Sequence, residues 1–224
     1  MKRGRIFLVG PTERTLMPME ETDYSREDIL QELLETYPDL LPGDQFTPES
    51  PRRWLLVACE MGVPDPSGLG DRRSLDHLYL DQDGIPTFVE CKRASDTRIR
   101  REVVAQMLDY AANGLTHWNV KRLRQAATES AKQRGKAIET EVQVLLGDGP
   151  EADIDSFWLR VEENLRSGKV RLLFVADSIP AELRRLVEFL NEKMSDVEVL
   201  AVEIKQFLGA GEQKVLVGLL RACM

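Results

Sequence analysis

Residues 74 to 92 read Ser74-Leu-Asp-His-Leu-Tyr-Leu-Asp-Gln-Asp-Gly-Ile-Pro-Thr-Phe-Val-Glu-Cys-Lys92. Two short apolar runs, 75–80 and 85–91, flank an Asp-Gln-Asp-Gly turn, and this pattern predicts a β-hairpin. If the turn centres near Gln82 and Asp83, residues pair across the strands when their numbers sum to about 165 or 166. Asp76 then lies across from Val89 or Glu90.

The predicted hairpin gathers two carboxylates and one ammonium in a small patch. Side chains alternate along a strand, so Glu90 and Lys92 share a face while Cys91 points the other way. Magnesium prefers oxygen ligands, usually one or two carboxylates with waters and substrate phosphate oxygens. A neighbouring lysine can orient the attacking water or stabilise charge that develops on the phosphate. Asp76, Glu90 and the backbone carbonyl of Cys91 are therefore candidate metal ligands, and Lys92 is a candidate catalytic residue.

The same charges have a simpler interpretation when they are taken alone. Opposite charges that face each other across strands are ordinary pairs on a sheet surface, worth about 0.2–1 kcal/mol. The spacing Asp-x13-Glu-x-Lys is a weak motif by itself. The segments on either side of the hairpin therefore decide between the two interpretations.

A helix is predicted on each side of the hairpin. Residues 100–112 carry apolar side chains at 103, 104, 107, 108 and 111, a helical period, and Asn113-Gly114 predicts its end. Gln106 and Tyr110 are four apart and lie on one face of this helix. An earlier helix is predicted from about residue 25 to 36, with Ser25 as its candidate N-cap. Glu27 borders its apolar face, although an acidic residue in a first turn also suits the helix dipole.

This succession of elements resembles the PD-(D/E)XK phosphodiesterase superfamily, the restriction-endonuclease-like nucleases. The resemblance rests on a helix with an acidic residue, an Asp, a Glu-x-Lys and a helix with Gln-x3-Tyr, all within residues 25 to 112. Leu75 stands where the family pattern has proline before the aspartate. The family implies a mixed sheet flanked by helices, with magnesium or manganese at the site.

The resemblance also assigns a role to each motif residue. Asp76 and Glu90 would be metal ligands, and Lys92 would be the catalytic lysine. Glu27 would be the auxiliary acid of the first core helix. Gln106 and Tyr110 match an element found in several exonuclease and repair-type branches of the family.

The charge distribution gives two opposing indications about nucleic acid. The whole chain has a net charge of −8, which is unfavourable for binding phosphate. Residues 92–136, however, hold eleven Lys and Arg against four Asp and Glu. This segment begins at Lys92, so contacts to nucleic acid are predicted for Arg93, Arg98, Arg100 and Arg101. The alternative is a solvated helix face, the usual setting of a run of charges.

The rest of the chain predicts a single α/β domain over residues 1–224. A first strand is expected within residues 1–10, and residues 37–72 read as a connection around an apolar run, 54–59, whose type periodicity does not settle. Residues 115–168 predict a helical insertion or cap. Beyond it, 170–176 reads as a strand buried on both faces, followed by a helix at 179–190 and a strand at 197–204. This β-α-β unit predicts a parallel pair, and 214–220 predicts a last strand.

Composition and motifs narrow the function further. No apolar run approaches the ~18 residues of a membrane span, and three cysteines give neither a disulfide framework nor a metal spacing, so a cytoplasmic protein is expected. Two histidines leave little for a histidine metal cluster or a serine triad.

The predicted function is a magnesium- or manganese-dependent nuclease of repair, restriction or defence type, acting on nucleic acid, with DNA favoured. The alternative is an inactive module of the same fold that binds nucleic acid or protein. A more distant alternative is a structural protein whose carboxylates are surface charge. Strandedness, DNA against RNA and a homodimeric state are left open.

Overall fold

The computed structural model of the chain describes residues 6–9, 16–64, 71–94, 102–149, 152–210 and 213–222. Its core is a mixed eight-stranded sheet in the order β1-β2-β7-β6-β5-β4-β3, with β8 paired to the other edge of β7. The strands are β1 (Ile6–Val9), β2 (Leu16–Thr22), β3 (Leu55–Pro64), β4 (Asp71–Leu80), β5 (Pro86–Lys92), β6 (Val170–Ala176), β7 (Val197–Leu208) and β8 (Lys214–Ala222).

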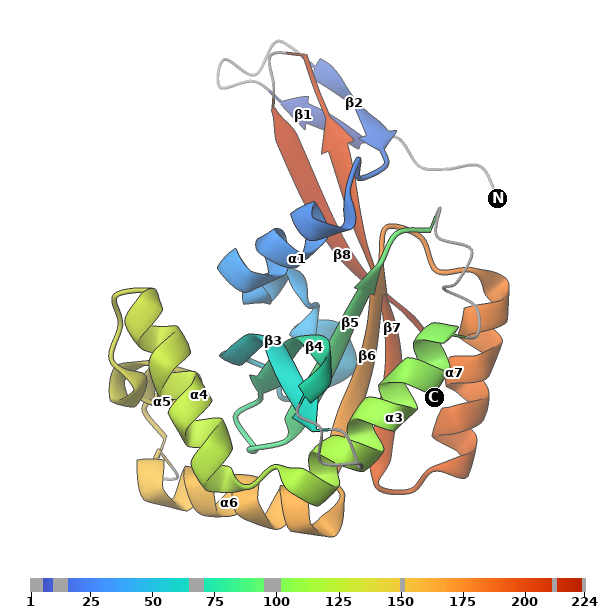
Figure 1. Cartoon of the computed structure of the whole chain (residues 1–224). Coiled ribbons are helices and arrows are strands. Elements are labelled where there is room, and N and C mark those ends of the chain that lie inside the picture. Colours follow the sequence, from blue (N-terminus) through green and yellow to red (C-terminus); the bar gives the residue numbers. More distant parts are fainter. Residues whose placement is uncertain are drawn as a thin grey trace.

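Helices cover both faces of this sheet (Figure 1). They are α1 (Glu27–Thr36), the short 3-10 helix η1 (Pro38–Leu40), α2 (Gly43–Phe46), α3 (Glu102–His117), α4 (Val120–Gln133), α5 (Ile138–Leu146), α6 (Ile154–Ser167) and α7 (Ala181–Lys193). Helix α1 lies on one side of β5 and β6, and α3 and α7 lie on the other.

Strand β6 shows why both faces need a cover. All seven of its residues are buried. Leu172 and Phe174 belong to the core under α3 and α7, whereas Leu173 and Val175 belong to the core under α1. A strand with apolar side chains on both faces is stable only between two layers, and the prediction for 170–176 is confirmed.

The predicted hairpin is confirmed with its register. His77 pairs with Val89 and Leu78 with Phe88, so paired numbers sum to 166. Strand β5 then runs parallel to β6, and β6 runs parallel to β7, as the β-α-β pattern predicts. The last strand is also confirmed as β8. Residues 55–59 of the undecided run at 54–59 belong to strand β3, which pairs with β4.

Two predicted helix ends are wrong. Helix α3 continues through Asn113 and Gly114 to His117. A Cβ on Gly114 would lie 3.0 Å from the Trp118 ring, so glycine is needed here for close packing and does not end the helix. Helix α1 begins at Glu27, with Arg26 at the N-cap position and no side-chain capping bond, so Ser25 is not the cap.

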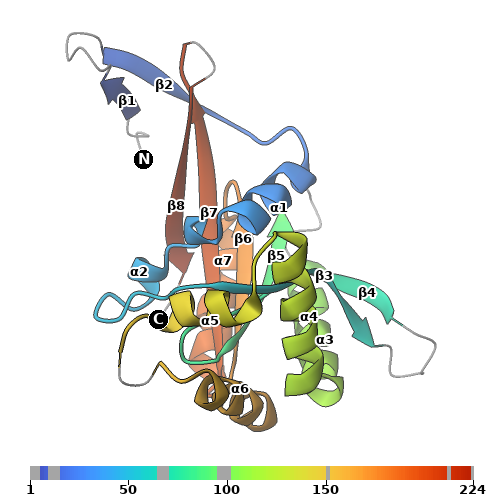
Figure 2. The same ribbon diagram turned by 90° about the vertical axis from the view of Figure 1, so that its left-hand side faces the viewer.

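Strand β7 extends the sheet beyond the helices. Its first residues pair with β6, whereas Gln206–Leu208 pair with β2 and residues 201–208 also pair with β8. Strand β1 pairs with β2 at the end of this ribbon. Figures 1 and 2 both show the β1–β2 hairpin projecting past α1. The predicted first strand is therefore present, but its partner β2 was not predicted.

The segment predicted as a helical insertion forms α4, α5 and α6, between α3 and β6 in the chain. Their buried residues Leu123, Val142 and Phe157 belong to the same apolar cluster as Leu172 and Phe174 of the sheet. Among the described helices, none combines the length and apolar character needed to cross a membrane.

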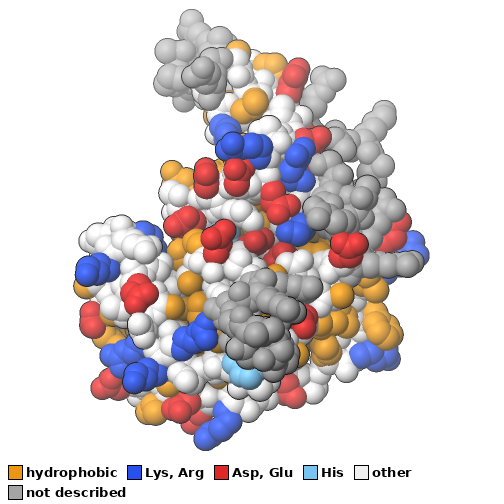
Figure 3. Space-filling view, viewed as in Figure 1, with side chains coloured by type: hydrophobic (Ala, Val, Ile, Leu, Met, Phe, Trp, Pro, Cys, Tyr) orange, Lys and Arg blue, Asp and Glu red, His pale blue; other side chains and the backbone are white. Residues whose placement is uncertain are grey.

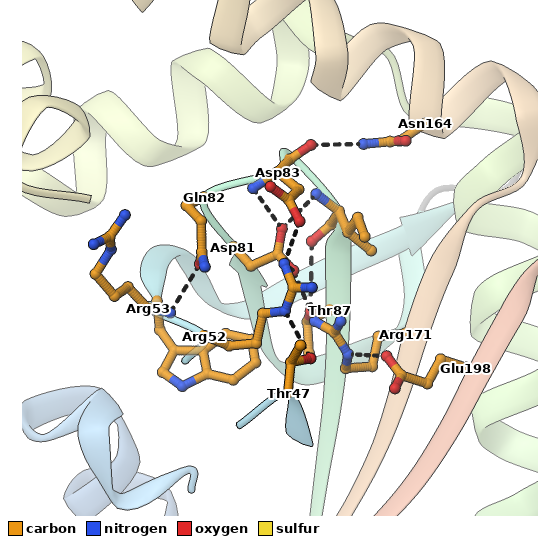
Figure 4. A network of polar contacts seen from close by, with 12 residues as sticks. Thr47, Arg52, Arg53, Asp81, Gln82, Asp83, Thr87, Asn164, Arg171 and Glu198 are labelled. Carbon is orange, nitrogen blue, oxygen red and sulfur yellow. Dashed lines mark hydrogen bonds and ion pairs between the residues drawn. The ribbon is translucent and has the colours of Figure 1, made fainter. Parts of the chain in front are cut away.

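A buried ion-pair network fixes the turn between β4 and β5 (Figure 4). Asp81 is fully buried, and its Oδ1 accepts hydrogen bonds from the backbone N–H groups of Asp83 (3.0 Å) and Ile85 (2.9 Å). Its Oδ2 accepts a bond from Arg171 Nη1 (3.1 Å). Arg171 also donates to Thr87 Oγ1 (3.1 Å) and, through Nε, to Glu198 Oε2 (2.5 Å). The hairpin is thus held to β6 and β7 at this end.

We expect Arg171→Met to lower the free energy of unfolding by up to about 3–5 kcal/mol, because it removes the closer of the two cations beside the buried Asp81 carboxylate and leaves only Arg52, whose Nη1 lies 3.6 Å from Asp81 Oδ2. Urea unfolding measures this change. The control Lys193→Ala removes an exposed pair with Glu192 and should change stability by less than about 1 kcal/mol. A loss for Arg171→Met as small as that of the control would show that the network does not stabilise the hairpin.

Candidate active site

The candidate site lies at the carboxyl end of β5, between α1 and α3. Strand β5 is an interior strand with β4 on one side and β6 on the other, so its last residues are held on both edges. Glu90 is only 1% exposed, while Lys92, two residues on, reaches the edge of the site with 16% of its side chain exposed. Lys92 pairs with Ala176, the last residue of β6.

The ammonium of Lys92 joins two elements. It donates to Glu27 Oε1 of α1 at 3.0 Å and lies 3.0 Å from Glu90 Oε1 of its own strand. It also donates to the backbone carbonyl of Cys91 at 2.8 Å. Three oxygens from two elements therefore surround one cation, which requires α1 to sit across the end of β5.

Helix α3 holds Glu90 from the opposite side. Gln106 Nε2 donates to Glu90 Oε1 at 2.8 Å and lies 2.5 Å from the hydroxyl oxygen of Tyr110. Residues four apart stand above one another on a helix, so Tyr110 sets the position of the Gln106 amide. The other carboxylate oxygen, Glu90 Oε2, is buried and has no hydrogen-bond partner among the described residues. Such an atom is costly in a protein interior unless a ligand satisfies it.

Asp76 completes the group from strand β4. Its Oδ2 accepts the backbone N–H of Cys91 at 2.7 Å, which fixes the carboxylate beside β5. The Gln31 side chain of α1 also hydrogen-bonds to Asp76. The next residue, His77, points to the α1 face, where its Nε2 bonds to the Gln31 carbonyl at 3.0 Å. His77 is thus a packed residue, as its alternation with Asp76 predicts.

The pKa values of Asp76 and Glu90 are both raised, mainly by burial. Burial raises the pKa of Glu90 to about 7, with a further contribution from the Asp76 charge, although Lys92 opposes both. Burial also raises the pKa of Asp76, again against the effect of Lys92. For Lys92, burial lowers the pKa, but Glu90, Asp76 and Glu27 together raise it above its usual value. Lys92 therefore stays protonated, but its single positive charge does not fully offset the negative charge of the neighbouring carboxylates.

A divalent cation fits this donor set. Magnesium needs only one or two carboxylates besides its waters, and Asp76 with Glu90 supplies them. A bound cation would give the buried Glu90 Oε2 a partner and would lower the raised pKa values of both carboxylates. Within the described residues, no three His, Cys, Asp or Glu side chains gather as a metal-binding group. The Cys91 carbonyl would have to be the third protein ligand.

The structure brings together seven residues that the sequence singled out, namely Glu27, Asp76, Glu90, Cys91, Lys92, Gln106 and Tyr110. Arg93 follows directly on β5 and is half-buried, with no hydrogen-bond partner on its buried Nε in the described part of the chain. The other three arginines predicted to contact nucleic acid, Arg98, Arg100 and Arg101, lie outside the described residues.

The later half of the basic segment has structural contacts of its own. Arg122 donates to the Gly62 carbonyl at 3.1 Å, and the Arg124 guanidinium lies 5.6 Å from the centre of the Trp158 ring. Arg134 and Lys136 both pair with Glu141, at 3.4 and 2.9 Å. These contacts favour the simpler interpretation of a charged helix surface for α4 and the turn after it.

Two residues near the site were missed from the sequence. Gln31 of α1 contacts Asp76, and nothing in its spacing set it apart. Asp177 directly follows β6, and its Oδ1 accepts the backbone N–H groups of Ala94 (2.6 Å) and Ser178 (3.1 Å). The β-α-β pattern did contain a signal for Asp177, because parallel strands end at the same edge of a sheet.

We expect Glu90→Gln to stabilise the protein relative to wild type increasingly as pH rises from about 5 to 8. The folded state of the wild type binds the Glu90 proton with a pKa of about 7, above the usual 4.5. Wild-type stability is therefore lost as pH rises through this window, by at most roughly 3 kcal/mol, and glutamine lacks this loss. Urea unfolding at pH 5, 6, 7 and 8 measures the difference. A difference that does not change with pH would mean that neither burial nor the Asp76 charge raises the pKa of Glu90 in the folded protein.

Comparisons with known proteins give no independent indication of what this site does. No family model, no curated protein and no solved structure matches the chain. The assignment to a family of nucleases therefore stays a proposal, and it rests on the site itself.

Proposed function

We propose that this protein is a metal-dependent nuclease of the restriction-endonuclease-like PD-(D/E)XK type, which hydrolyses phosphodiester bonds, with DNA as the favoured substrate. One observation carries the proposal: the buried, unpartnered Glu90 oxygen lies in a site shared with Asp76 and the Lys92 ammonium. A buried carboxylate oxygen without a partner is costly, and a bound cation would satisfy it.

Each residue of the site would have a distinct role in this reaction. Asp76, Glu90 and the Cys91 carbonyl would hold magnesium or manganese, and the bound ion would supply Lewis acidity and a more acidic water. Gln106 keeps the Glu90 carboxylate turned toward the site, and Tyr110 keeps Gln106 in place. Lys92 stays protonated beside them. Its charge can stabilise the negative charge that builds up on a phosphate in the transition state.

The surface charge limits how a nucleic acid can approach. Figure 3 shows acidic side chains gathered over α1, which carries Glu27, Asp28, Glu32 and Glu35. This flank attracts metal ions and repels phosphate. We propose that the nucleic acid approaches from the side of Arg93, which directly follows β5.

A binding module without turnover is the second candidate, and one observation favours it. Lys92 already neutralises Glu27 and Glu90 and occupies the Cys91 carbonyl, so much of the cluster is satisfied without a metal. Such a cluster can persist as a structural element. Cleavage of nucleic acid separates the two functions.

The test is incubation with linear, circular and single-stranded DNA in the presence of magnesium or manganese. We expect wild-type protein to cleave at least one of these substrates, and the pattern distinguishes cutting inside a strand from cutting at an end. Salt-dependent binding without cleavage, under either metal, would replace the nuclease with the binding module.

We expect Lys92→Ala to reduce cleavage by roughly 10²-fold or more, because the lysine acts mainly on transition-state charge. The matched control is Lys193→Ala, which removes an exposed cation from α7 and should cleave as wild type does. DNA binding, measured by fluorescence anisotropy, should change little in either variant. Undiminished cleavage by Lys92→Ala would assign the activity to other residues or to a contaminant.

A further inference from the structure

We propose that Lys92 is a built-in competitor for the metal ion, and that Glu27 is the residue that receives its ammonium when the metal binds. The inference rests on the proposed function in one respect, since it assumes that Asp76, Glu90 and the Cys91 carbonyl are the metal ligands. The new element is that the position of the Lys92 ammonium sets the affinity of the site for the metal ion.

The competition follows from shared ligands. The Lys92 ammonium lies 2.8 Å from the Cys91 carbonyl oxygen and 3.0 Å from Glu90 Oε1, two of the groups that a metal ion would use. With a metal–oxygen distance of about 2.1 Å, an ion on the same carbonyl would lie no more than about 5 Å from the ammonium. Two cations this close repel each other strongly in a site with so little water.

The Lys92 ammonium has a partner that it can keep when a metal ion binds. Its third partner, Glu27 Oε1 at 3.0 Å, belongs to α1 and has 32% of its side chain exposed, whereas Glu90 has 1%. Lysine has a flexible four-carbon stem, so its ammonium can leave Glu90 and the carbonyl and keep Glu27. Glu27 then acts as a positioning residue, which holds the charge beside the metal and does not bind the ion.

The two roles predict a specific coupling between variants. If Glu27 acts through Lys92, its removal weakens metal binding only while the lysine is present. If Glu27 is a metal ligand or a distant negative charge, its removal weakens binding equally with and without the lysine. A double-mutant cycle separates these cases.

The experiment is titration of manganese(II) alone into the wild type, Lys92→Met, Glu27→Gln and the double variant, by calorimetry. A pH of 8.5 limits proton competition at Glu90. Lys92→Gln repeats the first change in case the methionine variant does not fold, and circular dichroism verifies the fold of each variant. Glu32→Gln on the exposed side of α1 and Lys193→Met on α7 are charge-matched controls, and both should bind manganese as the wild type does.

We expect Lys92→Met to bind manganese about ten-fold more tightly than wild type, and Glu27→Gln to bind about ten-fold more weakly. In the Lys92→Met background, Glu27→Gln should change affinity by less than about two-fold. Equal or weaker binding by both lysine variants would overturn the competition. An equal effect of Glu27→Gln in both backgrounds would overturn the role of Glu27.

The outcomes also separate this inference from the proposed function. If the wild type cleaves DNA but the Lys92 variants bind manganese with unchanged affinity, only the competition is refuted. The expected cycle without cleavage of any substrate supports the competition and refutes the nuclease. Absence of manganese binding in the wild type and in both lysine variants overturns both.

Discussion

A single ammonium group faces three carboxylates at the end of β5. The electrostatics of the site follow from this excess of negative charge. Lys92 contacts Glu27 and Glu90 directly, and its charge also opposes the rise in the pKa of Asp76. Because burial and mutual repulsion raise the pKa of Glu90 to about 7, the cluster is under electrostatic stress without a further cation. A divalent cation bound by these carboxylates would offset this excess of negative charge, as the proposed function requires.

The fold places this cluster at the end of an interior strand of the sheet. Strand β5 lies between β4 and β6, and the ion-pair network of Asp81 and Arg171 fixes the opposite end of the same hairpin. Helices α1 and α3 reach the site from opposite faces of the sheet, so Glu27 and Gln106 approach Glu90 and Lys92 from two sides. The long β7–β8 ribbon and the β1–β2 hairpin project beyond this frame (Figures 1 and 2).

Local patterns made much of this geometry predictable. Alternation and the Asp-Gln-Asp-Gly turn predicted the pairing of His77 with Val89, and helical spacing placed Gln106 and Tyr110 on one face. Features that depend on distant parts of the chain were not predictable. Strand β2 contains Pro18 and pairs with β7 across more than 180 residues, and the contact of Gln31 with Asp76 depends on how α1 docks. Gly114 was misread because a glycine required for packing against Trp118 looks the same in sequence as one that ends a helix.

The proposed function depends on one cation that Asp76, Glu90 and the Cys91 carbonyl would hold. The most direct test is a crystal structure of the protein soaked in manganese(II), with data collected at the manganese absorption edge. We expect a single anomalous peak within about 2.1–2.3 Å of a carboxylate oxygen from each of the two acids. A peak elsewhere on the protein, or none at this site under conditions in which manganese binds in solution, would contradict the account.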